Sequence, residues 1–271
     1  MSATLPRLEH EPPRPNGFAV FWALFLRDVR VTQREIVSYL LRTTIQPLLF
    51  VVVFGHLLSK MGFMADSYKT TLLPGILAVS LALASLQSVI LPMVADFGWT
   101  REIDDRLLAP AGTHVIVLEK IVAAVLQGIL STLFVLPMTR LIMGPIAGLT
   151  LTHYGEIALV TVLGASAFST MGLVLGTAVQ PQQIGLMFSL ILTPMIFFGC
   201  AYFPWRGLDV VPALKYGVLV NPLVYVAEGM RAVFTPGEPH MPLGVVCAAL
   251  AGMTLVFWLL GMRSFIKRAY S

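Results

Sequence analysis

The feature that most constrains this chain is a long stretch without charged side chains. Residues 157–205, about 49 positions, contain no Asp, Glu, Lys or Arg. One crossing of the hydrocarbon core of a bilayer takes roughly 20 apolar residues, so the stretch is long enough for two crossings. Its main polar interruption is the run Gln180-Pro181-Gln182-Gln183. We therefore predict two membrane helices joined by a tight turn.

The composition of the whole chain agrees with a membrane protein. Hydrophobic residues make up 57% and charged residues 12%, against about 25% charged in soluble domains. A length of 271 residues suits one domain of about six spans. Cys200 and Cys247 lie in apolar runs and are expected to be packing residues, not a disulfide or a zinc site. The net charge of +4 is modest, so nucleic acid is not an expected partner.

The first 17 residues are rich in proline and contain two acidic residues. They lack the basic segment and following apolar segment of a cleavable signal peptide. We expect residues 1–17 to form a disordered cytoplasmic tail. Residues 269–271 are the corresponding carboxyl-terminal end.

Residues 18–35 have an amphipathic pattern. At 100° per residue, apolar residues share one side and arginines cluster on the other. The pattern predicts an interfacial helix, with aromatic rings in the acyl boundary and arginines toward anionic lipid headgroups. The aromatic side includes Phe18, Phe21, Trp22 and Phe25, and the basic side has Arg27, Arg30 and Arg34.

Six stretches are apolar and long enough to be membrane spans. Of the 18 Lys and Arg residues, about 12 fall on the side that carries both termini and about 6 on the other. Positive charge is retained in the cytoplasm, so both termini are predicted to be cytoplasmic. The sequence thus predicts an all-α, multi-pass membrane protein, and the family resemblance given below implies the inner (plasma) membrane of a bacterium. The spans are residues 39–58, 71–95, 121–139, 157–179, 184–203 and 242–262.

The loop after the second span contains a short charged segment that ends at Pro110. Glu102 and Arg106 are four residues apart, which favours a helix by a few tenths of a kcal/mol. Two interpretations fit this pattern equally: a solvated connection, or a surface on which a partner docks. The segment comprises Arg101, Glu102, Ile103, Asp104, Asp105, Arg106, Leu107 and Leu108.

Two short apolar segments lie between Pro204 and the last span. Asn221 followed by Pro222 is a good helix start, because Asn caps helices and Pro is tolerated at the first helical position. Glu228 and Arg231 are three residues apart and can pair on one helical face. The pattern predicts an extracellular re-entrant helical hairpin. The alternative, a seventh span over residues 210–226, would place the basic carboxyl tail outside.

The chain has no visible source of energy for transport. No phosphate-binding loop is present, and the five histidines lack metal-ligand spacing. Carboxylates and histidines that could relay protons are nearly absent from the predicted spans. We therefore expect that the chain is not an enzyme, and that any transport depends on another subunit. An ion-coupled secondary transporter is the alternative, and a membrane-embedded enzyme or scaffold is a third.

The order of these features resembles the permease of type-2 ABC exporters, a family that includes daunorubicin-resistance and polysaccharide-export permeases. The resemblance covers residues 18–268. It rests on Arg101-Glu102 followed by Leu107-Leu108-Ala109-Pro110, and on Phe203-Pro204 followed by Asn221-Pro222-Leu223 and Arg231. In that family the first motif is the coupling helix that meets the ATPase, and the second belongs to the re-entrant hairpin. By resemblance, residues 18–35 are the connecting helix.

The resemblance implies a dimer of permeases, formed with a second copy or a related chain, bound to two nucleotide-binding ATPase subunits. ATP and Mg²⁺ would be held by those subunits, and this chain would bind no cofactor of its own. The expected cargo is hydrophobic or amphiphilic: a drug, a lipid or a lipid-linked glycan. Candidate residues lining the pathway in the fifth span are Phe188, Met195, Phe197 and Phe198.

Overall fold

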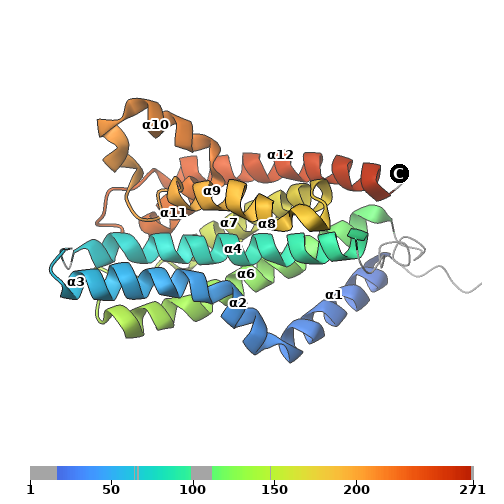
Figure 1. The fold of residues 1–271 in the computed structure, drawn as a ribbon, viewed down its shortest axis with the longest axis horizontal. Coiled ribbons are helices and arrows are strands. Elements are labelled where there is room, and N and C mark those ends of the chain that lie inside the picture. The colour runs from blue at the N-terminus through green and yellow to red at the C-terminus, as the bar shows by residue number, and fades with distance from the viewer. Residues whose placement is uncertain (1–16, 64, 66, 99–111, 147, 270–271) are drawn as a thin grey trace, which may run out of the picture.

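The computed structural model describes residues 17–63, 65, 67–98, 112–146 and 148–269, and every regular element in this part of the chain is a helix. Long helices run beside one another along the longest axis of the molecule (Figure 1). One end of the bundle carries α10 (Pro212–Gly217) and α11 (Pro222–Phe234), and we call it the hairpin end. The opposite end carries α1 (Gly17–Arg34) and the last basic residues of the chain, and we call it the basic end.

Five helical stretches in the described residues are long and apolar enough to cross a bilayer. They coincide with predicted spans one, two, three, four and six, with longer helical bounds. The third helix begins at Thr113, before the predicted start at residue 121. Its residues Glu119 and Lys120 are buried. The five are Ile36–Lys60 (α2 with a π-helical turn and α3), Tyr68–Gly98 (α4), Thr113–Met143 (α6), Tyr154–Ala178 (α7) and Leu243–Ala269 (α12).

The fifth predicted span is shorter than expected. Its helical residues are Pro181–Phe197, about 25 Å at 1.5 Å per residue. It consists of a 3-10 turn, α8 (Ile184–Met187), a π-helical segment (Phe188–Leu192) and α9 (Thr193–Phe197). The prediction continued to residue 203, but the chain turns at Gly199 and Cys200, which has φ 53°. A side chain at Gly199 would collide with Leu223 of α11, 2.4 Å away, so the hairpin occupies the space into which the helix would continue.

Helix α4 is the centre of the bundle, and most of its residues are buried. Small residues let its neighbours approach closely. A Cβ at Gly172 or Gly176 of α7 would lie about 3 Å from Leu86 or Met93 of α4. On the other side, the hydroxyls of Ser80 (α4) and Ser131 (α6) are 3.0 Å apart. Small residues of the fourth span therefore pack directly against α4.

Gly75 of α4 gives a sharp test of this packing. A Cβ at this position would lie 1.6 Å from the carbonyl oxygen of Ala201, whereas a Cβ at Gly252 of α12 would meet nothing within 4 Å. We expect Gly75→Ala to lower the thermal unfolding midpoint in detergent by about 5 °C or more, because backbone must move to relieve the overlap. Gly252→Ala should leave the midpoint unchanged or slightly raised, since Ala favours helix over Gly. Equal midpoints would contradict this packing.

Candidate functional site

Helix α1 confirms the predicted amphipathic helix at residues 18–35. None of its residues is fully buried, and it slopes away from the bundle at the basic end (Figure 1). The rings of Trp22 and Phe25 stack at 5.5 Å, and those of Phe21 and Phe25 at 6.1 Å. Phe18 and Trp22 remain largely exposed, as do Arg27, Arg30 and Arg34. Such a helix suits a membrane interface, and its placement there stays a prediction.

An acidic residue attaches α1 to the bundle. The carboxylate of Asp28 accepts hydrogen bonds from Lys120 Nζ of α6 at 3.0 Å and from Arg27 Nε at 3.4 Å. One turn later, Gln127 Nε2 of α6 donates to the Thr32 hydroxyl at 2.9 Å. Asp28 was not predicted as a site residue, although it is the single carboxylate among the arginines of α1.

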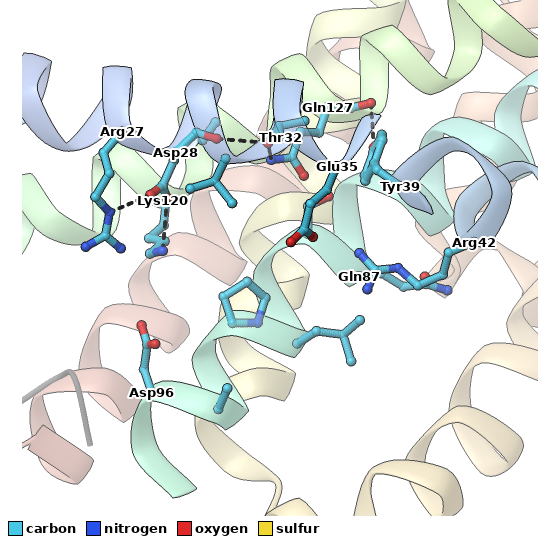
Figure 2. Close-up of a pocket in the computed structure, with 16 residues that line it drawn as sticks. Arg27, Asp28, Thr32, Glu35, Tyr39, Arg42, Gln87, Asp96, Lys120 and Gln127 are labelled. Atoms are coloured by element: carbon cyan, nitrogen blue, oxygen red, sulfur yellow. Dashed lines mark hydrogen bonds and ion pairs between the residues drawn. The ribbon is translucent and has the colours of Figure 1, made fainter. Parts of the chain in front are cut away.

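A polar cleft lies between α1, α2, α4 and α6 at the basic end (Figure 2). Its volume is about 390 Å³, within the range of small-molecule sites. Tyr39 closes one wall, because its hydroxyl donates to the Gln127 carbonyl at 2.8 Å. None of the α4 and α6 residues of this cleft was predicted as a site. The labelled lining residues are Arg27, Asp28, Thr32, Glu35, Tyr39, Arg42, Gln87, Asp96, Lys120 and Gln127.

Aromatic rings fill the space between the first span and the end of the fifth span, near the hairpin end. Tyr202 lies 5.0 Å from Phe50, 5.8 Å from Phe54 and 6.4 Å from Phe197, measured between ring centroids. The Tyr68 hydroxyl fixes this turn by donating to the Tyr202 carbonyl at 2.9 Å. The first and fifth spans are therefore bridged by aromatic rings toward the hairpin end.

Two short helices, Pro212–Val220 and Pro222–Phe234, precede the last span and are bent by 98° relative to each other. Residues 210–226 are therefore not one straight helix, and the re-entrant hairpin stays a prediction beside a seventh, broken span. Asn221 caps α11 by accepting from Leu223 N at 2.9 Å, and its Nδ2 donates to the Met195 carbonyl of α9 at 2.7 Å. The predicted Asn-Pro helix start is confirmed. Pro204 directly precedes a 3-10 helix, Trp205–Val210.

Glu228 and Arg231 of α11 form the predicted pair, and both side chains are fully buried. Glu228 also accepts from the backbone N–H groups of Trp205 at 2.8 Å and Met241 at 2.9 Å. Arg231 Nη2 donates to the Cys200 carbonyl at 3.0 Å. This buried pair therefore joins α11 to the turn after α9 and to the segment that leads into α12.

The remaining predicted residues fall into two groups. The coupling segment, residues 101–108, lies outside the described residues. In the fifth span, Met195 is buried in the core and Phe188 is partly buried against it, whereas Phe197 and Phe198 are about half exposed. Their role as a pathway lining stays a prediction.

Five long apolar helices and one bent helix pair in the described residues are those of a multi-pass membrane protein. The sequence model of the ABC-2 type transporter family matches residues 19–235. The chain is 27% identical over 251 residues to the inner membrane transport permease YadH of Escherichia coli strain K12, a match covering 89% of this chain and 94% of YadH. YadH of Shigella flexneri gives the same values.

The chain therefore belongs to the ABC-2 type transporter family, as its resemblance predicted. It is a multi-pass inner-membrane transport permease. Permeases of this family work with an ATP-binding subunit.

The buried pair in α11 gives a second test. We expect Arg231→Met to cost about 3 kcal/mol of stability, because it leaves the Glu228 charge buried without its partner. Adding Glu228→Gln to that variant should recover part of the loss, since no uncompensated charge then remains. The measurement is the thermal unfolding midpoint in detergent.

The control for this test is an exposed ion pair at the same end of the bundle. Asp209 pairs with Lys215, and the Asp209 side chain is 64% exposed. Asp209→Asn should therefore change stability by less than about 1 kcal/mol. If Arg231→Met lowers the unfolding midpoint no more than Asp209→Asn does, the buried pair does not hold the hairpin.

Proposed function

We propose that the chain is the permease subunit of an ATP-driven exporter that moves a hydrophobic or amphiphilic molecule out of the cytoplasm. The observation that carries this proposal is the asymmetry of the bundle. The polar cleft is open at the basic end, while the aromatic rings and the buried Glu228–Arg231 pair close the hairpin end. A permease in this conformation receives cargo from the basic end, which the positive-inside rule assigns to the cytoplasm.

The energy source follows from the family and from the sequence. The chain carries no nucleotide-binding motif, and permeases of its family work with an ATP-binding subunit. We infer that ATP and Mg²⁺ bind to that separate subunit, and that this chain holds no cofactor. ATP binding would then stabilise one global conformation of the permease over another.

We infer that the ATPase docks at the basic end. Residues 101–108 follow directly after α4, whose last residue is Gly98. A force applied there acts on the most buried helix of the bundle, which packs against α6, α7 and α11. The sloping helix α1 lies at the same end and would serve as the connecting helix.

We infer that a second permease, either a copy or a related chain, covers the exposed face of the fifth span. Leu186, Leu190 and Phe197 are 62%, 68% and 52% exposed. They recur at spacings of four and seven residues, which places them on one face of the helix. A dimer formed on this face would place the two clefts on either side of a shared pathway.

The docking segment provides the test of this function. In a complex reconstituted with its ATPase subunit, Glu102→Ala with Arg106→Ala should lower the ATPase rate coupled to transport by about tenfold. ATP-driven uptake of an amphiphilic dye into inside-out vesicles should fall in parallel. Membrane insertion should be unchanged, because both residues lie outside the predicted spans.

The matched control removes one positive and one negative charge at the hairpin end. Arg140→Ala with Glu156→Ala alters two exposed side chains far from the proposed docking surface. This variant should retain the ATPase rate and the uptake. If the Glu102/Arg106 variant matches this control, residues 101–108 do not couple the two subunits.

A further inference from the structure

The polar cleft contains charges of both signs, and among the residues that the structure describes some of them form no ion pair. Asp28 binds both Arg27 and Lys120. In the described part of the chain, neither Glu35 nor Arg42 makes an ion pair, and both are exposed on the wall of the cleft. Arg42 lies within an apolar membrane span. Charged residues in such positions usually mark a water-filled cavity or a binding site.

The charged and polar side chains of α2 and α4 follow the same order with depth in the cleft. Helix α2 runs from the basic end into the bundle, so Arg42 lies about 10 Å deeper than Glu35. Helix α4 runs in the opposite direction, so Gln87 and Ser88 lie about 13 Å deeper than Asp96. Figure 2 shows Arg42 beside Gln87, with Glu35 between them and the side of the cleft that holds Asp96. Along α2 and α4 the guanidinium and the donor groups are therefore deep and the carboxylates shallow. The two other cations of the lining, Arg27 and Lys120, lie toward the side of Asp96 and are bound by Asp28.

This order fits one class of ligand. A guanidinium is well suited to bind phosphate, and the Gln87 amide and Ser88 hydroxyl are further donors at the same depth. Carboxylates accept hydrogen bonds from an ammonium group. In a phospholipid whose tails point toward the middle of the bilayer, the phosphate lies deeper than the terminal ammonium. The two walls of the cleft thus match the headgroup of an aminophospholipid.

We propose that this cleft binds the headgroup of a zwitterionic aminophospholipid, with the phosphate at Arg42 and Gln87 and the ammonium at Glu35. A primary ammonium fits better than a trimethylammonium, which has no N–H to donate and is usually held by aromatic faces. Among the described residues that line the cleft, Tyr39 is the one aromatic residue, and it is buried with its hydroxyl bonded to the Gln127 carbonyl. The ligand class is therefore phosphatidylethanolamine in preference to phosphatidylcholine.

Lipid is favoured over a soluble phosphoamine because of where the cleft lies. It opens at the end of the apolar spans, and its lining includes apolar residues of α1 and α4: Val31, Leu91, Pro92 and Ala95. Deeper along α2, Ile45 and Leu49 are exposed on the helical face that carries Arg42, and they suit the glycerol and upper acyl region below the headgroup. The inference concerns binding and needs no ATPase, so it can fail or succeed independently of the proposed export function.

The test uses the full-length chain, purified in detergent and stripped of lipid. Native mass spectrometry follows titrations with phosphatidylethanolamine, phosphatidylcholine and phosphatidylglycerol of identical acyl chains. We expect phosphatidylethanolamine to bind about tenfold more tightly than the other two. Arg42→Gln should weaken its binding about tenfold, and Arg42→Lys should restore part of it. Glu35→Gln should lower the affinity for phosphatidylethanolamine to the affinity for phosphatidylglycerol.

Arg30→Gln is the matched control, because Arg30 is an exposed arginine of α1 that does not line the cleft. It should bind phosphatidylethanolamine like the unmodified chain. The proposal is overturned if the three lipids bind equally, or if the Arg42 and Glu35 variants behave like this control. It is also overturned if water-soluble glycerophosphoethanolamine binds as tightly as the lipid. Thermal unfolding midpoints of all variants establish that each is folded.

Discussion

The bilayer offers no water to the groups inside it, so every charge buried among the spans needs a partner within the protein. Among the residues that the structure describes, Glu228–Arg231 and Asp28–Lys120 are two such pairs, one at each end of the bundle. Glu228 and Arg231 hold the hairpin against the turn after α9, and Asp28 with Lys120 holds α1 against α6. The first pair allows α11, with 13 residues, to remain packed although it is too short to cross a membrane. The second attaches a helix that otherwise buries none of its residues.

The two ends of the bundle consequently differ in packing. The hairpin end is packed around a fully buried pair and a cluster of aromatic rings, and the basic end is open through a cleft of mixed charge. The first and fifth spans each contain a π-helical segment, at Val51–Leu57 and Phe188–Leu192. Such segments occur often at functional positions, and here they interrupt the two spans that the aromatic rings bridge.

Much of this fold could be predicted from the sequence, because the requirements of a bilayer are strong and local. Runs of apolar residues of the right length gave five spans, the Asn221-Pro222 pair gave the start of α11, and a spacing of three residues gave the Glu228–Arg231 pair. Each of these signals lies within one helix. The class of protein followed from the order of the segments, and the family match confirms it.

What could not be predicted depends on contacts between distant residues. The third span was predicted to start at residue 121, whereas α6 begins at Thr113; Lys120 within it pairs with Asp28, 92 residues earlier, a partner that no local pattern indicates. The early end of the fifth span depends on α11 lying in its path at Leu223. The cleft itself combines residues of four helices, and no single segment carries a pattern that identifies it.

The central claim is that this chain forms a conduit whose movement is driven by another protein. The most direct measurement is uptake of a fluorescent amphiphile by liposomes that contain only this chain, with an imposed pH gradient and with ATP. We predict no accumulation against the concentration gradient until the ATPase subunit is added together with ATP. Sustained uphill accumulation by the chain alone would contradict the account.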